Sequence, residues 1–208
     1  MTSDALRRDL RLAYDRAADV RDGMADADWK QLERQRFGDL LRRAGAAKVL
    51  EIGAGHGVSG RYLADQGFAV TCVDLSPELA ARCRAKGLTA CVMDFGALGF
   101  APASFDAAFG MNCLLHVPRA ALDGVLSSIR RVLTPDGLFY WGQYGGHEFE
   151  GIYANDPYEP KRFFSRMPDE QIQRAATRHF ELVDFHTIPI DIDSWTYQAL
   201  VLRRPAQR

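Results

Sequence analysis

Two hydrophobic patterns alternate along this chain. Short, mainly apolar runs typical of buried strands occupy residues 48–52, 69–74, 89–93, 105–111 and 138–141. Between several of them, apolar residues recur every three or four positions, which predicts helices over 58–65, 77–87 and 122–133. This alternation predicts an α/β fold with a doubly wound, Rossmann-like, seven-stranded and mostly parallel sheet that has helices on both faces.

The pattern changes on both sides of this α/β core. Helical spacing over 5–19 and 28–44 predicts an N-terminal helical cap, in which Trp29, Leu32 and Phe37 share one apolar face with Leu40 and Leu41. After Gly142 the alternation stops, and residues 143–167 mix aromatic residues with glycine, proline and charge. This composition favours a long loop or lid.

The C-terminal part returns to regular structure. A helix is predicted over 168–179, followed by strands over 180–188 and 195–202 joined by residues 189–194, a connection short enough for an antiparallel pair. The final strand of the sheet is therefore expected to be antiparallel. We divide the single domain into a helical cap (1–47), a core (48–142), a lid-like insertion (143–167) and a C-terminal helix with its strand pair (168–208).

Composition narrows the classes of partner. The 208 residues include 26 Lys and Arg against 27 Asp and Glu, so the net charge is −1 and offers no field that would draw nucleic acid or an anionic membrane. The four cysteines are scattered without metal-ligand spacing and are expected to be free, buried thiols in a reducing compartment. With no apolar leader or membrane-length run, we expect a cytoplasmic protein without a metal site.

Unusual residues gather where strands of the core end. Gly53, Gly55 and Gly57 follow the first strand, Asp74 ends the second and Asp94 follows the third. In open α/β sheets, ligands bind outside the carboxyl ends of the strands, where glycines allow close approach and an acidic residue accepts hydrogen bonds from ribose. These residues predict a nucleoside-containing cofactor.

The identity of that nucleoside is a separate question. Residues 55–60 formally satisfy G-x-G-x-x-G, a weak signal that also suits a dinucleotide. Glu51 precedes the glycines inside the first strand, where its negative charge would repel a pyrophosphate and favour a cationic cofactor. An NAD(P)-dependent oxidoreductase and a non-catalytic nucleoside-binding module remain as alternatives.

Five segments in order resemble the motifs of the class I S-adenosylmethionine-dependent methyltransferases. They are Val49–Gly57, Val73–Ser76, Met93–Phe95, Phe105–Val117 and Leu133–Gly137. Together with Tyr14-Asp15 in the cap, they are most similar to the small-molecule branch of that family. The resemblance implies S-adenosyl-L-methionine as cofactor, S-adenosyl-L-homocysteine as product, and methyl transfer to a hydroxyl, carboxyl or amine of a small organic acceptor by a monomer or homodimer.

The resemblance also implies roles for individual residues. The cofactor-binding set would be Tyr14, Arg36, Glu51, Gly53, Ala54, Gly55, Gly57, Asp74, Leu75, Asp94, Phe95, Asn112 and Leu115. Within this set, Asp74 would hold the ribose, Leu75 and Phe95 would sandwich adenine, and Asp94 would accept from the adenine amino group. Glu51, the glycines, Asn112 and Leu115 would surround the methionine portion, with Tyr14 and Arg36 reaching it from the cap.

Methyl transfer requires mainly an in-line approach and the exclusion of water, with a proton removed when the acceptor is a hydroxyl. His116, just past the fourth strand, is the first candidate for a general base because imidazole titrates near neutrality, and His147 in the lid is the second. A helix cap next to Pro118 is an equally good interpretation of His116.

Overall fold

The structure is a computed structural model of the chain, and it describes residues 3–190 and 195–206. Its centre is a seven-stranded sheet with the order β3-β2-β1-β4-β5-β9-β8. The strands of this sheet are β1 (Lys48–Ile52), β2 (Ala69–Asp74), β3 (Thr89–Val92), β4 (Phe105–Met111), β5 (Leu133–Gly145), β8 (Glu181–Pro189) and β9 (Thr196–Arg203). Only β9 runs antiparallel to both of its neighbours, so the predicted mostly parallel sheet with an antiparallel final strand is confirmed.

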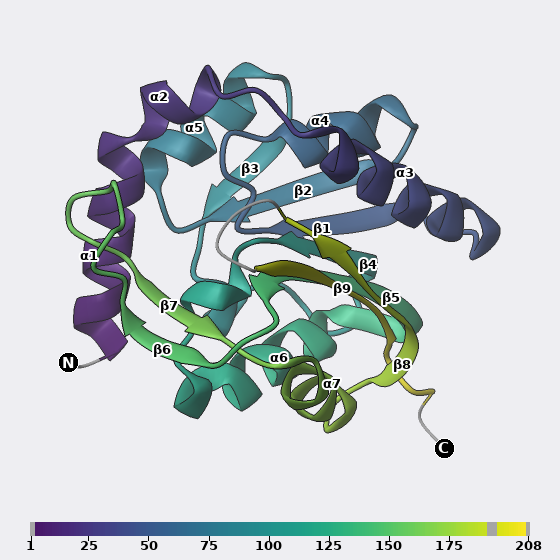
Figure 1. Cartoon of the computed structure of the whole chain (residues 1–208). Helices are drawn as coiled ribbons and strands as arrows, with labels where there is room; N and C mark the ends of the chain where they lie inside the picture. Colours follow the sequence, from purple (N-terminus) through teal and green to yellow (C-terminus); the bar gives the residue numbers. More distant parts are fainter. Residues whose placement is uncertain (1–2, 191–194, 207–208) are drawn as a thin grey trace.

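Helices cover both faces of the sheet (Figure 1). One face carries α3 (Asp28–Arg43), α4 (Val58–Asp65) and α5 (Pro77–Ala85), and the other carries α6 (Arg119–Val132) and α7 (Asp169–Thr177). Each face has its own apolar cluster, built around Phe37, Leu63 and Phe109 on the first and Leu126, Ile129 and Trp141 on the second. The strands in the middle are buried on both sides, which explains their nearly continuous apolar runs.

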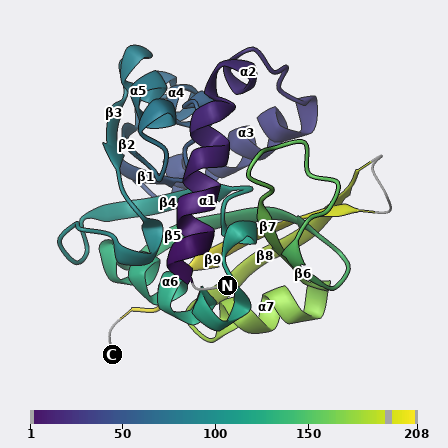
Figure 2. The same ribbon diagram turned by 90° about the vertical axis from the view of Figure 1, so that its left-hand side faces the viewer.

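The first two helices lie across the end of the sheet where the parallel strands finish (Figure 2). The helix predicted over 5–19 is interrupted at Ala17, giving α1 (Ser3–Arg16) and α2 (Ala18–Asp22). The apolar face predicted for 28–44 is partly wrong, because Leu32 is 56% exposed while Glu33 and Arg34 are buried in α3. Glu33 is buried because it accepts a hydrogen bond from the Tyr140 hydroxyl at 2.9 Å.

The lid-like insertion contains more regular structure than its composition indicates. The strand predicted over 138–141 extends to Gly145, and β6 (Phe149–Ile152) pairs with β7 (Phe163–Arg166) in a separate antiparallel sheet beside α1. The sequence does not predict this pairing, because glycine and proline, which are unfavourable in strands, occur within or near the two short strands. Residues 153–162 form the connection between the two strands.

Two 3₁₀ turns complete the described elements, η1 (Phe95–Ala97) after β3 and η2 (Leu114–His116) after β4. The predicted turn at 134–137 appears as an irregularity inside β5, where the pairing with β4 shifts and Asp136 has a φ of 62°. The connection predicted over 189–194 lies mostly outside the described residues. In the described part of the chain, no helix is long and apolar enough to cross a membrane.

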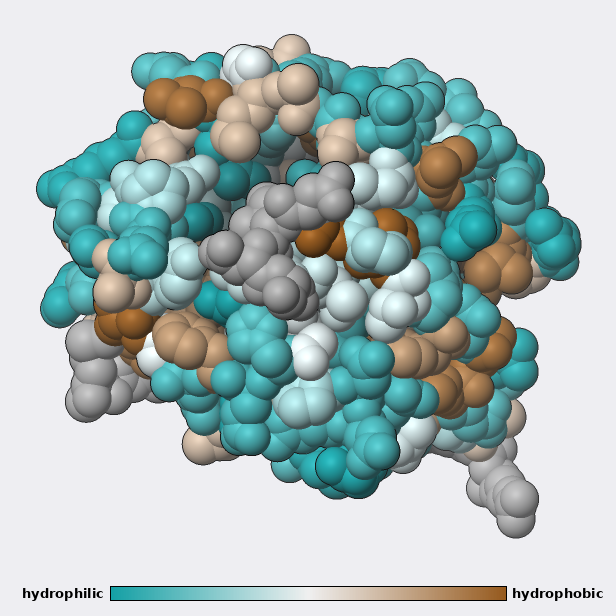
Figure 3. Space-filling view, in the orientation of Figure 1, coloured by the Kyte–Doolittle hydropathy of each residue, from teal (hydrophilic) through white to brown (hydrophobic). Residues whose placement is uncertain are grey.

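The surface seen from the direction of Figure 1 is mainly hydrophilic, with its apolar side chains divided among several patches (Figure 3). Exposed large apolar residues are correspondingly dispersed over different elements, including Val20 of α2, Leu32 of α3 and Val183 of β8. Isolated exposed apolar residues are common on folded proteins and do not mark a binding face. A binding site is therefore expected at the ends of the strands.

Candidate functional site

The loop between β1 and α4 forms the floor of a pocket at the carboxyl ends of the strands. Gly53 has a φ of 59°, and a Cβ at this position would collide with the side chain of Cys113. Gly57, whose φ is 82°, is the N-cap that precedes α4, and a Cβ there would lie 3.0 Å from Cys83 Sγ. Glycine is therefore required for the left-handed backbone and for the close packing, which leaves the loop backbone accessible to a ligand.

Asp74 ends β2 beside this loop. Its Oδ2 accepts the Gly55 N–H at 2.8 Å and its Oδ1 accepts the Ser76 N–H at 2.9 Å. The residue is 8% exposed, and burial raises the pKa of its carboxyl to about 6. Each oxygen keeps a further lone pair, so the carboxylate is fixed in position and can still accept hydrogen bonds from a ligand.

Glu51 lies deeper, within β1. Burial raises the pKa of its carboxyl to about 8, although the Cys72 thiol donates a hydrogen bond to Oε2 at 3.3 Å. A Cβ at Gly60 would come within 2.5 Å of the same Oε2 atom, so the absence of a side chain in α4 makes room for this carboxyl. Burial therefore favours the protonated form of Glu51 at neutral pH, so the negative charge expected here from the sequence develops only when a cation lies beside this carboxyl.

The pocket brings together most of the predicted cofactor-binding residues. From that set, its lining includes Tyr14, Glu51, Gly53, Ala54, Gly55, Asp74, Leu75, Phe95 and Asn112, together with His116. Gly57, Asp94, Leu115, Arg36 and His147 do not line it. Gly57 and Leu115 still support the wall, since Gly57 is the N-cap of α4 and Leu115 is buried within η2.

Asp94 lies next to the pocket. It lines an adjoining cavity together with Leu75 and Phe95, which are shared by both cavities. Its Oδ1 accepts the Gly96 N–H at 2.7 Å, which holds η1 in place, and its Oδ2 lies 3.3 Å from Arg7 Nε of α1. The structure therefore keeps Asp94 at the side where Leu75 and Phe95 present apolar surface.

The predicted position of Arg36 is wrong. Its side chain is 67% exposed and contacts Glu33 and His186 on the outer side of α3. Lys30 and Arg34 line the pocket instead, together with Arg21 of α2. Residues four positions apart share a helix face, so Lys30 and Arg34 point inward together, whereas a residue two positions further along points away. Helical spacing alone could have identified this pair, but not which face of α3 turns toward the core.

Asn112 follows β4 and has a φ of 56°, a conformation that asparagine tolerates better than most residues. Its N–H donates to the Gly142 carbonyl at 2.7 Å, which ties β4 to β5 at the pocket. Its side-chain Oδ1 is buried without a hydrogen-bond partner among the described residues. An unpartnered buried acceptor is costly, so this atom fits a ligand that brings a hydrogen-bond donor.

His116 does not present a free nitrogen to the pocket. Its Nδ1 lies 2.8 Å from the Phe163 carbonyl, which can only accept, so Nδ1 carries the hydrogen. Nε2 then accepts the Tyr14 hydroxyl hydrogen at 2.8 Å. Burial lowers the pKa of His116 to about 3, so the ring is neutral. The structure therefore favours neither a general base nor a helix cap. Through its two hydrogen bonds, His116 instead connects its own element, η2, to α1 and β7.

Further contacts at this junction between the cap and the lid come from the connection between β6 and β7. Arg162 donates from Nη1 to the Tyr14 hydroxyl at 3.0 Å and pairs with the buried Asp156 at 2.7 Å. Its guanidinium also lies 3.6 Å from the centre of the Tyr158 ring. Tyr158 in turn accepts a hydrogen bond from Arg21 of α2 at 3.1 Å. The sequence showed an aromatic, charged insertion but gave no signal for these pairings.

His147, the second candidate base, lies elsewhere in the lid. Its Nε2 is 3.1 Å from Arg166 Nη1, and its ring centre is 6.3 Å from that of Trp195. Burial lowers the pKa of His147, and the Arg166 charge lowers it further. Because the ring is outside the pocket lining, the structure does not bring His147 together with the predicted cofactor-binding residues.

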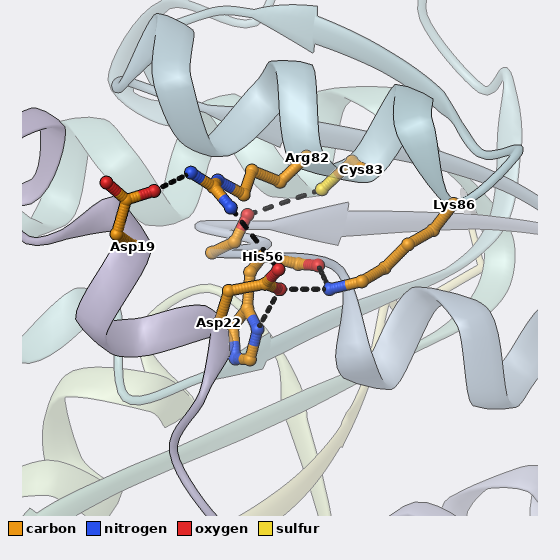
Figure 4. A network of polar contacts seen from close by, with 7 residues as sticks. Asp19, Asp22, His56, Arg82, Cys83 and Lys86 are labelled. Atoms are coloured by element: carbon orange, nitrogen blue, oxygen red, sulfur yellow. Dashed lines mark hydrogen bonds and ion pairs between the residues drawn. The ribbon is translucent and has the colours of Figure 1, made fainter.

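A network of ion pairs holds α2 against the glycine loop and α5 (Figure 4). Asp22 accepts from Lys86 Nζ at 2.6 Å, lies 3.1 Å from His56 Nδ1 and contacts Arg82 at 3.3 Å. Lys86 also donates to the His56 carbonyl at 2.7 Å, and Arg82 pairs with Asp19. Hydrogen bonds, that from Lys86 first, lower the pKa of Asp22 to about 2. We call this network the cap clasp.

The residues of the pocket fit the cofactor that the sequence motifs imply. The glycine loop leaves backbone exposed, Asp74 can accept from hydroxyls, Leu75 and Phe95 offer apolar surface, and the unpartnered Asn112 Oδ1 matches an ammonium donor. Among the described residues, no group of three or more His, Cys, Asp or Glu side chains is arranged to hold a metal ion.

Comparison with known proteins agrees with this fit. Residues 49–137 match a family of sequences described as a methyltransferase domain. Over 129 residues the chain is 34% identical to the demethylmenaquinone methyltransferase of Tropheryma whipplei, an alignment that covers 60% of this chain and 52% of that protein. It is also 32% identical over 158 residues to the malonyl-[acyl-carrier protein] O-methyltransferase of Geobacter sulfurreducens, covering 72% of this chain and 58% of that protein. The chain thus spans about half the length of the curated relatives it matches.

A solved structure extends the similarity to the whole fold. The 1,6-didemethyltoxoflavin-N1-methyltransferase of Burkholderia thailandensis, determined with 1,6-didemethyltoxoflavin and S-adenosylhomocysteine bound, superposes with a TM-score of 0.75 at 25% identity. The alignment covers 98% of this chain and 88% of that one. The similarity therefore includes the cap and the lid, beyond the residues matched by the family.

Proposed function

We propose that this chain, which belongs to the class I S-adenosylmethionine-dependent methyltransferases, transfers the methyl group of that cofactor to a hydroxyl, carboxyl or amine of a small organic molecule. The observation that carries the proposal is the pocket in which the glycine loop, Asp74 and the unpartnered Asn112 Oδ1 meet. The relatives and the solved structure that resemble this chain bear the names of methyltransferases, several of them for small molecules.

Each part of the cofactor has a counterpart in the pocket. Asp74 would accept the ribose hydroxyls, and Leu75 with Phe95 would contact the adenine ring, beside Asp94. Asn112 Oδ1 would accept from the ammonium of the methionine portion. Arg34 or Arg21, rather than Arg36, would pair with its carboxylate, because only these two of the three guanidinium groups line the pocket.

The protein's contribution to the chemistry is positioning. When bound, the cofactor supplies an electrophilic methyl: an acceptor lone pair bonds to its carbon while the carbon–sulfur bond breaks and the electron pair stays on sulfur. The chain orients the acceptor in line and excludes water, which together lower the barrier for such displacements. His116 is unsuited to removing a proton, since Phe163 and Tyr14 occupy both of its nitrogens.

His116, Tyr14 and Arg162 instead close the pocket. Tyr14 belongs to α1, His116 to η2 and Arg162 to the connection before β7, so their hydrogen bonds join the cap, the core and the lid at one point. We assign these three residues to holding the cap and lid together over the reacting groups. An acceptor hydroxyl or amine would then pass its proton to a basic group on the acceptor itself or, once the product leaves, to bulk solvent.

Calorimetric titration with S-adenosylhomocysteine tests whether the chain binds the cofactor that the proposal requires. We expect one site per chain with a dissociation constant in the micromolar range, and no heat from NAD⁺ or NADPH under the same conditions. Binding of a nicotinamide cofactor in its place would support the oxidoreductase alternative. A folded sample that binds neither S-adenosylhomocysteine nor S-adenosylmethionine would remove the methyltransferase proposal.

A further inference from the structure

Lys30 faces the pocket from the first turn of α3 and takes no part in the contacts that hold the cap. It lines the same pocket as Asp74 and Asn112, and it has no ion-pair partner among the described residues. Burial lowers the pKa of its ammonium group, so the side chain sits in a partly desolvated position. The charge of Asp26 partly offsets this lowering of the pKa, but Asp26 is ion-paired with Arg34. Lys30 thus has no ion pair of its own and suits an anion that arrives from outside.

The surroundings of Lys30 place it away from the ribose end of the pocket. Its Nζ lies 5.5 Å from the centre of the Trp29 ring, and Trp29 packs against Tyr144 of β5 and Tyr197 of β9. Asp74, in contrast, ends β2, on the other side of β1 and β4 in the sheet order. Lys30 therefore occupies the side of the pocket toward β5, whereas Asp74 marks the side where ribose would lie.

The charges around the pocket leave a positive excess. Three cations, Arg21, Lys30 and Arg34, line it with three carboxyl groups, those of Asp26, Glu51 and Asp74, and Asp26 is already paired with Arg34. Glu51 adds little negative charge because burial raises its pKa to about 8. S-adenosylmethionine itself brings a sulfonium, an ammonium and one carboxylate, so it adds one net positive charge, which in turn favours ionisation of Glu51.

We propose that the methyl acceptor is an acid, a small molecule with a carboxylate or an acidic hydroxyl, and that Lys30 is the residue that selects it. The inference rests on the proposed function and narrows it. The uncompensated positive charge stabilises a bound anion, whereas a protonated amine would add a further cation to a partly desolvated site. Lys30 pairs with the acidic group and thereby fixes how the acceptor lies relative to the methyl group.

The nature of the neighbouring side chains suggests suitable probes. Trp29 and Tyr144 are aromatic and their ring centres lie 6.3 Å apart, so aromatic acids are chosen with their neutral amides as matched partners. Benzoate is compared with benzamide and 4-hydroxybenzoate with 4-hydroxybenzamide. Binding to protein saturated with S-adenosylhomocysteine is followed by saturation-transfer NMR, which detects dissociation constants in the millimolar range.

We expect the acid of at least one pair to bind about tenfold more tightly than its amide, and Lys30→Met to abolish that preference. Lys30→Arg should retain most of it because the charge remains. Lys48→Met is the matched control, since Lys48 is exposed at the start of β1 and should leave the preference unchanged. Thermal unfolding of each variant establishes that the fold is intact.

Two results would overturn the inference while leaving the proposed function standing. One is normal binding of S-adenosylhomocysteine by the wild-type protein with no preference for the acid in either pair. The other is a Lys30→Met variant that loses affinity for S-adenosylhomocysteine as strongly as for the acids, which would assign Lys30 to the cofactor carboxylate. Failure of the wild-type protein to bind S-adenosylhomocysteine would instead contradict the proposed function.

Discussion

The cofactor-binding core and the cap–lid junction are built in different ways. In the core, neighbouring turns position the groups: Asp74 is fixed by the N–H groups of Gly55, 19 positions away in the β1–α4 loop, and of Ser76, two positions away. At the junction, Tyr14 meets His116, 102 positions away, and Arg162, 148 positions away. The core is therefore formed by local backbone geometry, and the junction by a few long-range polar contacts.

This difference indicates which property a single substitution should change in each region. Backbone geometry in the core is shared among many strand and helix hydrogen bonds, so one altered side chain changes affinity more than architecture. At the junction, Arg162 and Asp156 form a nearly buried ion pair, in which loss of one partner leaves the other charge uncompensated. Variants in the two regions should accordingly separate stability from cofactor binding.

The largest effect is expected from Arg162→Ala. It leaves the Asp156 carboxylate, 1% exposed as a side chain, without its ion-pair partner, and we expect the free energy of unfolding to fall by about 3 kcal/mol. Denaturant unfolding measures this loss. Arg174→Ala is the control, because its ion pair with Glu170 is exposed and should change stability by no more than about 0.5 kcal/mol. Similar losses in both variants would contradict the structural role of the buried pair.

The next effect concerns affinity in the core. Asp74→Ala removes an ionised acceptor, and we expect the dissociation constant of S-adenosylhomocysteine to rise roughly 30-fold, corresponding to about 2 kcal/mol. His116→Ala should raise it less, because His116 contacts Tyr14 and Phe163 rather than serving as a ribose acceptor. Calorimetry on both variants makes the comparison. Equal losses would undo the assignment of Asp74 to the ribose.

A pH dependence follows from Glu51. Its folded-state pKa, about 8, is raised above the ordinary 4.5, so the folded state binds the proton more tightly. The stability from this group is present below pH 4.5 and is lost as pH rises through about 8. Between pH 6 and 8, we expect cofactor-free wild-type protein to lose roughly 2 kcal/mol relative to Glu51→Gln, which cannot ionise. Parallel unfolding curves for the two proteins across this range would show that Glu51 is not buried as described.

The smallest effect tests the cap clasp. Asp22→Asn weakens contacts to Lys86, His56 and Arg82, and we expect S-adenosylhomocysteine to dissociate two- to fivefold faster in stopped-flow measurements. Asp19→Asn is the matched control, since Asp19 is almost fully exposed and contacts Arg82 alone in the clasp. High salt should accelerate dissociation from the wild-type protein in the same direction, because it screens exposed charges. Identical rates for all three proteins would exclude a role for the clasp in retaining the ligand.

The core could be predicted from sequence because its signals are local. A glycine that needs a positive φ, an aspartate that ends a strand, and alternating apolar runs each act within a few residues, and Gly53, Asp74 and the sheet were predicted from them. The β6–β7 pair was missed because its strands are only four residues long, β6 includes Gly151, and Pro160 and Pro168 lie within three positions of β7.

The cap was predicted as helices but not in its orientation. The choice between Arg34 and Arg36 depends on which side of α3 faces the core, and that is decided by packing of Phe37 and Leu41 against the sheet. His116 is likewise a candidate base from the sequence alone, because nothing in the sequence indicates that Tyr14 and the Phe163 carbonyl occupy its two nitrogens. Contacts between distant segments set both outcomes.

The central claim is that one pocket holds the cofactor at Asp74 and leaves Lys30 for the acceptor. A crystal structure of the protein with S-adenosylhomocysteine tests it most directly. We expect the ribose hydroxyls at hydrogen-bonding distance from the Asp74 carboxylate, the amino group at Asn112, and the Lys30 ammonium free of the ligand's carboxylate. A ligand bound with its ribose away from Asp74, or with its carboxylate on Lys30, would contradict this claim.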